Sequence, residues 1–306
     1  MGKASITKLL TGREIALSIS ESPDLEVLGL SLMHLQDAMV EFARYLFAAD
    51  ARIFYGGDLR PGGFTEILFN LVRTYPPNVR EGEPSRSVVN YLAWPRWLRQ
   101  TKAQKADILG LAEIHEVRPP AGLVADEGVY LEPDSTASRF VWARCHTAMR
   151  EEMNRDLDAR IVMGGRLTGY QGCYPGILEE TLLALRDGKP VYVLGGFGGC
   201  AAEIANALEG KTPKGLTESF QFEYKEYRDL ADFYNQRVKE DASVGRPIDY
   251  QKILEILHRT GAVGLGNGLS EEENQRLFRA VHVPELIALV LKGLSQLFEG
   301  RGAMRV

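Results

Sequence analysis

Asp158-Ala-Arg-Ile-Val-Met163 is a short run of apolar and β-branched residues, and it predicts a buried β-strand. A glycine-rich segment follows at once, Gly164-Gly-Arg-Leu-Thr-Gly-Tyr-Gln-Gly-Cys-Tyr-Pro-Gly176. Residues 177–185 then carry apolar side chains at helical spacing, with Pro175 suited to the first helical turn and Gly188 to the position just after the helix. This order of strand, glycine loop and helix is the repeating unit of parallel α/β sheets.

A second unit of the same kind follows directly. Pro190-Val-Tyr-Val-Leu194 predicts a strand, Gly195-Gly-Phe-Gly-Gly199 a second glycine loop, and residues 201–208 a helix. Two consecutive units place free backbone N–H groups and two helix N-termini at one edge of a sheet. An anion such as phosphate binds well at an edge of this kind.

The same alternation extends over the N-terminal half of the chain. Strands are predicted at residues 15–20, 52–55, 88–94 and 112–117, and helices at residues 32–49, 64–72 and 134–156. Residues 74–86 are rich in Pro, Arg and Glu and are expected to form a loop, and the segment that begins at Trp94 is expected to be irregular. We therefore expect an α/β fold with a Rossmann-like, doubly wound, mostly parallel sheet.

Beyond about residue 211 the strand pattern fades and only helical patterns remain. The expected helices are residues 224–238, a helix from a cap at Asp249 to Thr260, a helix behind the capping box of Ser270 and Glu273, and a last helix from Pro284 to Phe298. We expect residues 1–306 to be a single domain, in which an α/β core of residues 13–210 carries a C-terminal helical extension of residues 211–306.

Composition excludes several classes of function. The net charge of the 306-residue chain is -5 and no run of Lys and Arg is present, so nucleic-acid binding is not expected. The longest apolar runs, such as residues 286–291, are too short to span a membrane, and residues 1–6 do not resemble a signal peptide. Three scattered cysteines fit a reducing cytoplasm, and the five histidines lack metal-ligand spacing, so we expect a cytoplasmic protein without a metal.

Three glycine loops are the candidates for a binding site. Because the carboxyl ends of parallel strands meet at one edge of a sheet, all three should lie together and cradle a phosphate-bearing ligand. Their expected contact residues are Gly56, Gly57, Gly62 and Gly63 in the first loop, Gly164 and Gly165 in the second, and Gly195, Gly196, Phe197, Gly198 and Gly199 in the third.

The third loop also fits a dinucleotide pattern. Gly196-Phe-Gly-Gly-Cys-Ala201 matches GxGxxA after a strand, which leaves a nicotinamide-dependent oxidoreductase as one alternative. That pattern normally follows the first strand of the fold. Its acidic partner should also lie about 20 residues further on, and Glu218 falls beyond the end of the unit.

At this point the chain resembles a known family. Arg150-Glu-Glu-Met153, Gly164-Gly165 and Pro175-Gly-Ile-Leu-Glu-Glu180 are similar to motifs of the SLOG superfamily, and Tyr55-Gly-Gly57 resembles a phosphate loop of its LOG branch. The superfamily unites LOG-type cytokinin-activating phosphoribohydrolases, DNA-processing Smf/DprA proteins, and ligand-sensing domains of bacterial conflict systems and melastatin-type channels. Gly195-Gly-Phe-Gly-Gly199 and Asn267-Gly-Leu-Ser-Glu-Glu-Glu-Asn274 resemble the sensor branch.

The resemblance implies a Rossmann-like fold and a nucleotide-derived ligand, which in the sensor branch is ADP-ribose-like or a cyclic relative. In the LOG branch an Arg and a Glu cleave the N-glycosidic bond of a nucleoside monophosphate. Arg150 matches that Arg, and Glu180 or Glu179 matches that Glu. The PGGxGTxxE motif of the LOG branch is replaced here by a longer loop and by Pro175-Gly-Ile-Leu-Glu-Glu180, so sensor and hydrolase remain alternatives.

Side chains near the glycine loops complete the predicted site. Ser18, Ser20 and Glu21 end the first strand and could touch a ribose or a base, and Pro175 and Gly176 open the helix behind the second loop. Asp58, Arg60, Arg166 and Tyr170 could pair with phosphate or stack on a base.

We therefore expect a cytoplasmic module that binds a nucleotide-derived signal, ADP-ribose-like or a cyclic nucleotide, in bacterial stress or anti-phage signalling. No effector domain is visible in the sequence, so a separate effector protein is an expected partner, and family resemblance implies a homo-oligomer. No cofactor is required on this interpretation. The alternative is a LOG-like N-glycosidic hydrolase that acts on a nucleotide or a signal nucleotide.

Overall fold

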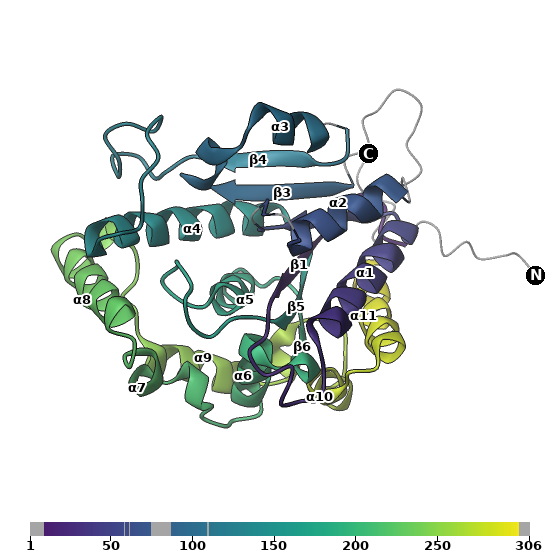
Figure 1. Cartoon of the computed structure of the whole chain (residues 1–306). Helices are drawn as coiled ribbons and strands as arrows, with labels where there is room; N and C mark the ends of the chain where they lie inside the picture. Colours follow the sequence, from purple (N-terminus) through teal and green to yellow (C-terminus); the bar gives the residue numbers. More distant parts are fainter. Residues whose placement is uncertain (1–8, 58, 61, 75–86, 109, 300–306) are drawn as a thin grey trace, which may run out of the picture.

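A six-stranded parallel sheet lies at the centre of the protein (Figure 1). The computed structural model describes residues 9–57, 59–60, 62–74, 87–108 and 110–299. The strands are β1 (Glu14–Ser20), β2 (Arg52–Tyr55), β3 (Val88–Ala93), β4 (Glu113–Val117), β5 (Ala159–Gly164) and β6 (Val191–Leu194).

The strand order is β4-β3-β2-β1-β5-β6. The chain runs outward from β1 to β4 and then returns to place β5 on the other side of β1. The order in which strands are added across the sheet therefore reverses between β1 and β5, and ligands of doubly wound folds bind beside this switch point. The predicted Rossmann-like α/β class is confirmed.

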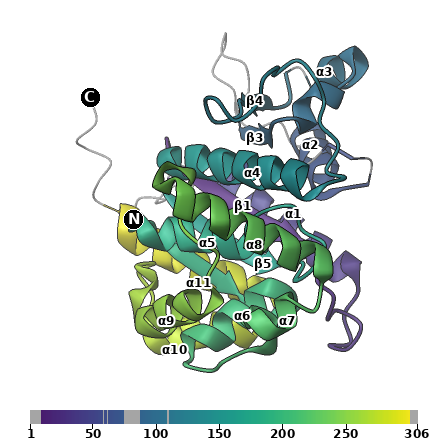
Figure 2. The same cartoon turned by 90° about the vertical axis from the view of Figure 1, so that its left-hand side faces the viewer.

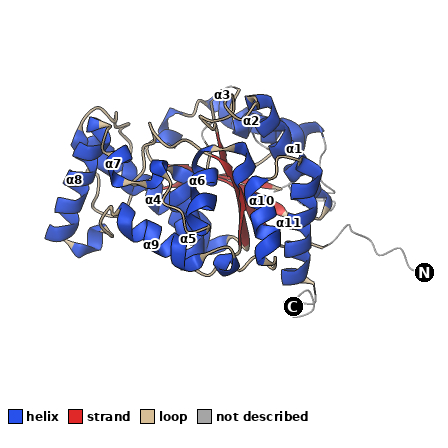
Figure 3. Ribbon diagram, turned by 90° about the horizontal axis from the view of Figure 1, so that it is seen from below, coloured by secondary structure: helices blue, strands red, loops and turns tan. Residues whose placement is uncertain are grey.

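Helices cover both faces of the sheet (Figure 3). The apolar side chains that alternate along β1 explain why: Ile15, Leu17 and Ile19 pack into one layer, whereas Ala16 packs into another on the opposite face. The first face carries α1 (Leu32–Ala48), α2 (Phe64–Thr74) and α11 (Val283–Phe298), and the second carries α4 (Thr136–Asp156), α5 (Gly176–Arg186) and α6 (Gly199–Leu208).

The C-terminal helices pack on this core. Helix α8 (Lys225–Glu240) lies along α4, α9 (Tyr250–Thr260) contacts α6, and α10 (Glu271–Arg279) contacts β6 (Figure 2). The predicted caps are present, because Asp249 accepts from the backbone N–H of Lys252 and Ser270 forms a capping box with Glu273. A short helix, α7 (Glu218–Gln221), precedes α8.

Two segments differ from the expectation. The irregular region after Trp94 contains a 3₁₀-helix, Arg96–Arg99, and helix α3 (Lys102–Ile108). Ile108 is the only buried residue of α3, so the sequence there has no apolar stripe that would indicate a helix. Most of the loop predicted at residues 74–86 lies outside the described residues. Within the described ranges, every helix is too short or too polar to cross a membrane.

Candidate functional site

A cavity of about 330 Å³ lies at the carboxyl ends of β1, β2 and β3, beside the switch point of the sheet. Residues 17–20 of β1 form part of its wall together with Gly56 and Gly57, the glycines that follow β2. The side opposite β2 is formed by the loop between β5 and α5, which contributes Tyr170 and Gln171. Parallel strands thus bring segments from distant parts of the chain to one rim.

Three arginines stand around this cavity. Arg60 and Arg166 come from the loops after β2 and β5, and both bond the exposed carboxylate of Glu21. Arg96 comes from the segment after β3, and its Nη2 donates to Oε1 of Gln171 at 2.6 Å. A rim with several guanidinium groups suits an anionic ligand, because each group donates in a planar fork that matches phosphate oxygens.

A buried cluster of charged side chains forms the floor. Arg150, on α4, forms an ion pair with Glu179 on α5, and its Nε lies 3.6 Å from Oε1 of Glu180. Arg150, Glu179 and Glu180 are 7%, 6% and 8% exposed. Arg150 and Glu180 line the cavity, whereas Glu179 lies behind them, where its Oε1 accepts from Thr147 at 2.5 Å. These contacts join α4, which carries Arg150, to α5, which carries both carboxylates.

Arg160 holds this cluster to the sheet. It projects from β5 and is wholly buried, and its Nη1 lies 2.7 Å from both Oε2 of Glu180 and the hydroxyl oxygen of Ser18. The Ser18 hydroxyl in turn donates to Oε2 of Glu180 at 2.5 Å. Nε and Nη2 of Arg160 have no hydrogen-bond partner among the described residues. Glu180 is therefore fixed in one orientation by groups from β1, β5 and α4.

Burial sets the electrostatics of the floor. It raises the pKa of Glu179 above the ordinary value of a glutamate, although Arg150 and Thr147 act in the opposite direction. Because Glu179 is paired on both oxygens, its contribution is structural support for Arg150. Glu180 presents its carboxylate to the cavity, where it can accept hydrogen bonds from sugar hydroxyls or stabilise a positive charge on a ribose ring.

His146 is a further polar residue of the cavity wall, one turn before Arg150 on α4. Its Nδ1 lies 3.0 Å from the carbonyl oxygen of Trp142 and must donate to it, which leaves Nε2 of the neutral ring as an acceptor. Burial lowers the pKa of His146 well below its ordinary value, and the charges of Arg150 and Arg96 lower it further. The imidazole is thus a neutral hydrogen-bond acceptor at physiological pH.

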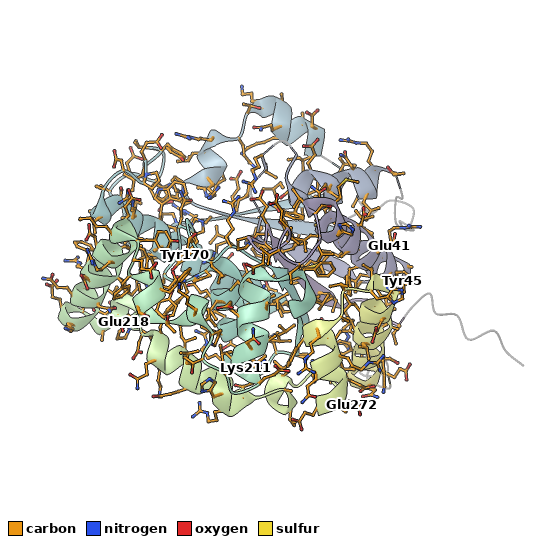
Figure 4. All side chains as sticks on the ribbon, turned by 60° about the horizontal axis from the view of Figure 1, so that its bottom comes forward. Glu41, Tyr45, Tyr170, Lys211, Glu218 and Glu272 are labelled. Atoms are coloured by element: carbon orange, nitrogen blue, oxygen red, sulfur yellow. The ribbon has the colours of Figure 1, made fainter. Side chains whose placement is uncertain are left out.

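The C-terminal helices hold the loop that forms one wall of the cavity. The hydroxyl of Tyr170, a residue labelled in Figure 4, donates to Oε1 of Gln221 at 2.7 Å. The same hydroxyl lies 2.9 Å from the hydroxyl of Tyr250. Tyr227 lies 3.0 Å from the same Tyr250 hydroxyl and donates to the carbonyl of Cys173 at 2.6 Å. The loop between β5 and α5 is therefore hydrogen-bonded to α7, α8 and α9.

The structure does not bring the third glycine loop to this cavity. All three loops leave the same edge of the sheet, as expected, but the N-terminus of α6 is already capped: Gly199 N–H donates to Asp24 Oδ2 at 2.7 Å, and Cys200 N–H donates to the carbonyl of Gly165. A Cβ on Gly196 would lie 2.1 Å from the carbonyl oxygen of Ala280. These glycines permit close packing against the chain itself, which corrects the expectation of three converging loops.

The predicted site residues divide into two groups. Those on the cavity wall are Ser18, Ser20, Gly56, Gly57, Arg60, Arg150, Arg166, Tyr170, Gly176 and Glu180. Those that do not line the cavity are Glu21, Gly62, Gly63, Gly164, Gly165, Pro175, Glu179, Gly195, Gly196, Phe197, Gly198 and Gly199, and Asp58 lies outside the described residues. Gly164 and Gly165 have φ values of +63° and +104°, and a Cβ on Gly164 would lie 2.6 Å from the carbonyl oxygen of Ser20.

The sequence reasoning missed Arg160, His146 and Arg96. Arg160 carried a usable signal, because an arginine inside a short apolar strand must find a buried partner. His146 carried no such signal, since the period of α4 does not reveal which turn faces a cavity. Arg96 lies in the segment that was expected to be irregular.

The fold and the cavity together define a Rossmann-like α/β protein with a polar, arginine-rimmed ligand site at the topological switch point. The family model described as SLOG cluster2 matches residues 9–277, and the chain belongs to the SLOG superfamily. The resemblance drawn from the sequence is thereby confirmed, and membership suggests a nucleotide-related function. No curated protein matches the chain significantly.

Proposed function

We propose that this protein binds a nucleotide-derived ligand in the cavity between β1, β2 and the loop that precedes α5. The observation that carries the proposal is the convergence of Gly56 and Gly57, the rim arginines and the Arg150–Glu180 pair on one cavity of about 330 Å³. That volume lies within the range of small-molecule sites, roughly 300–1,000 Å³. Membership of the SLOG superfamily supports the same class of ligand.

The cavity offers different chemistry to each part of a nucleotide. A phosphate would lie at the rim, near Arg60 and Arg166 and near the start of α2, where the helix dipole favours negative charge. Ribose hydroxyls would meet two acceptors that line the cavity, the carboxylate of Glu180 and Nε2 of His146. The ring of Tyr170 supplies a flat aromatic face on the opposite wall.

In the proposed biological role the ligand is a signal in bacterial stress or anti-phage defence, ADP-ribose-like or a cyclic nucleotide. The hydrogen bonds from Tyr170 to Gln221 and Tyr250 supply a physical route for the signal. A ligand that moves Tyr170 also strains the contacts of α7 and α9, and these helices lie on the outside of the molecule (Figure 1). A separate effector, or a second copy of the chain, would recognise the altered surface.

Binding is tested with AMP, NAD and ADP-ribose by calorimetry and by thermal unfolding. A ligand that binds only the folded protein raises the melting temperature. We expect at least one of these nucleotides to bind, and Arg166→Gln to weaken binding about tenfold or more, while Arg237→Gln on the exposed face of α8 leaves it unchanged. If none of the three nucleotides binds, the proposal fails.

A second candidate function is hydrolysis of an N-glycosidic bond, and the position of Glu180 favours it. The Glu180 carboxylate faces the cavity and is held in place by Arg160 and Ser18. A fixed orientation of this kind is needed for a group that acts on a reacting ribose. In this reaction the bond between C1′ and the base nitrogen breaks, and a water oxygen bonds to C1′. A water proton passes to a departing adenine, whereas nicotinamide leaves NAD as a neutral molecule and the proton passes to solvent. Glu180 would stabilise the oxocarbenium-like ribose.

The two functions are separated by incubating the pure protein with AMP, NAD and ADP-ribose and measuring free base. Base release that Glu180→Gln abolishes, with binding retained, identifies the hydrolase. Binding without base release identifies the sensor. Thr181→Ser, a conservative change at the neighbouring buried position on α5, is the control for disturbance of that helix.

A further inference from the structure

A second cavity, of about 200 Å³, adjoins the first. Leu92 and Arg96 line both cavities, and the loop after β2 also reaches both, through Leu59 in the second and Arg60 in the first. The guanidinium of Arg96 is held in place, because it donates to Gln171 and lies 5.3 Å from the centre of the Trp142 ring. The two cavities are therefore neighbours along a single surface, with a cation between them.

The walls of the second cavity suit a flat heterocycle. Leu59 and Leu92 supply apolar surface, and Tyr130 supplies an aromatic ring. The guanidinium carbon of Arg99 lies 3.7 Å from the centre of that ring, so a cation already rests on one face of Tyr130. Apolar and aromatic walls with a few polar groups are typical of sites that bind planar ring systems.

Gln100 supplies the polar recognition. It lines the second cavity, yet both Nε2 and Oε1 of its amide are shielded from solvent and lack hydrogen-bond partners among the described residues. A buried amide without partners is unfavourable, so a group that offers one acceptor and one donor side by side would be bound strongly once the amide turns toward it. The edge of an adenine ring has this arrangement, and glutamine pairs with it through two hydrogen bonds.

We propose that the second cavity is a subsite for a nucleobase, and that the ligand of this protein is a two-part molecule of the dinucleotide type. One nucleoside would lie in the Arg150–Glu180 cavity, the base of the other would lie against Gln100 and Tyr130, and the linking phosphates would pass Arg96. The inference rests on the proposed function, because it extends the ligand from the site described above.

The proposal is tested by comparing the dissociation constants of AMP and NAD for the wild-type protein and Gln100→Leu. We expect NAD to bind at least tenfold more tightly than AMP. Gln100→Leu should remove most of this advantage and leave the dissociation constant of AMP within twofold of its original value. Gln236→Leu, on the exposed side of α8, is the matched control and should change neither constant.

Folding of the variant is checked independently. Leucine removes the unpartnered amide at similar volume, so the unliganded Gln100→Leu protein should unfold at the same temperature as the wild type or a higher one. Tyr130→Leu provides a second variant with the same expected loss of NAD binding. The proposal is overturned if NAD binds no more tightly than AMP, or if both variants weaken the two ligands equally. If neither AMP nor NAD binds the wild type, the proposed function itself fails and this inference fails with it.

Discussion

Nη1 of Arg160, on β5, lies 2.7 Å from Oε2 of Glu180, on α5, and the arginine is wholly buried. The pair joins the central part of the sheet to the first turns of the helix that carries the cavity carboxylate. The Ser18 hydroxyl bonds both members of the pair, so β1 is included in the same contact. The geometry of the site thus depends on an interaction that is also part of the core.

Loss of one member of this pair should be costly. Arg160→Met would leave Glu180 as a buried carboxylate without its main partner, and we expect the free energy of unfolding to fall by about 3–5 kcal/mol. The double variant Arg160→Met/Glu180→Leu removes both charges and should recover much of that loss. Urea denaturation of both proteins measures the difference. A double variant as unstable as the sum of its single variants would contradict this account. Arg186→Met, at an exposed ion pair, should cost about 1 kcal/mol or less.

The lowered pKa of His146 predicts a pH dependence of stability. Below the unfolded-state value of about 6.5, the unfolded chain takes up a proton that the folded His146 does not accept. The free energy of unfolding should therefore fall as the pH falls from about 7 to 5, by up to ~1.4 kcal/mol per pH unit for this group. His146→Gln should flatten that part of the curve, as measured by denaturation at a series of pH values. His282→Gln changes an exposed side chain and should leave this pH dependence of the unfolding free energy unchanged.

The tyrosine contacts predict that a residue outside the cavity affects ligand binding. Tyr250→Phe removes the hydroxyl that lies within 3.0 Å of Tyr170 and Tyr227. We expect a loss of about 1–2 kcal/mol in unfolding free energy, because buried hydroxyls lose a partner. Weaker binding of AMP or NAD should accompany it, since the loop that carries Tyr170 is held less firmly. Tyr45→Phe, at an exposed tyrosine of α1, should change neither quantity. Unchanged affinity in Tyr250→Phe would show that these contacts are structural alone.

Two glycines should differ in their effect on ligand binding when replaced by alanine. A Cβ on Gly57 would lie 1.9 Å from the ring of Tyr55 and 2.6 Å from the hydroxyl of Thr65, and both residues line the cavity. Gly57→Ala should therefore weaken nucleotide binding tenfold or more, and it should also lower the free energy of unfolding because the Tyr55 ring must shift. Gly196→Ala instead crowds the carbonyl oxygen of Ala280 and should destabilise the fold by roughly 1–3 kcal/mol, with affinity retained in the folded fraction. Calorimetry and urea denaturation of both variants decide between these effects.

The sequence predicted the fold well for a physical reason. Strand and helix periods are local properties, so the alternation from Glu14 to Leu208 could be read from runs of about ten residues. Helix α3 was missed because Lys102–Ile108 buries only Ile108 and therefore shows no periodicity. The family resemblance selected Arg150 and the Glu179–Glu180 pair, and the structure places all three in one buried cluster.

By itself, then, the amino-acid sequence determined the order of the strands and helices, the edge at which the glycine loops lie and the superfamily of this protein. Tertiary packing alone decided which loops remain open to a ligand. Asp24 and Gly199 are 175 residues apart in the chain, yet the carboxylate of Asp24 accepts a hydrogen bond at the N-terminus of α6. The glycine pattern had predicted an anionic ligand at that position. Arg160 and Ser18 are 142 residues apart and meet only because β1 and β5 pair. Local patterns cannot reveal such contacts, because each depends on where the rest of the chain has folded.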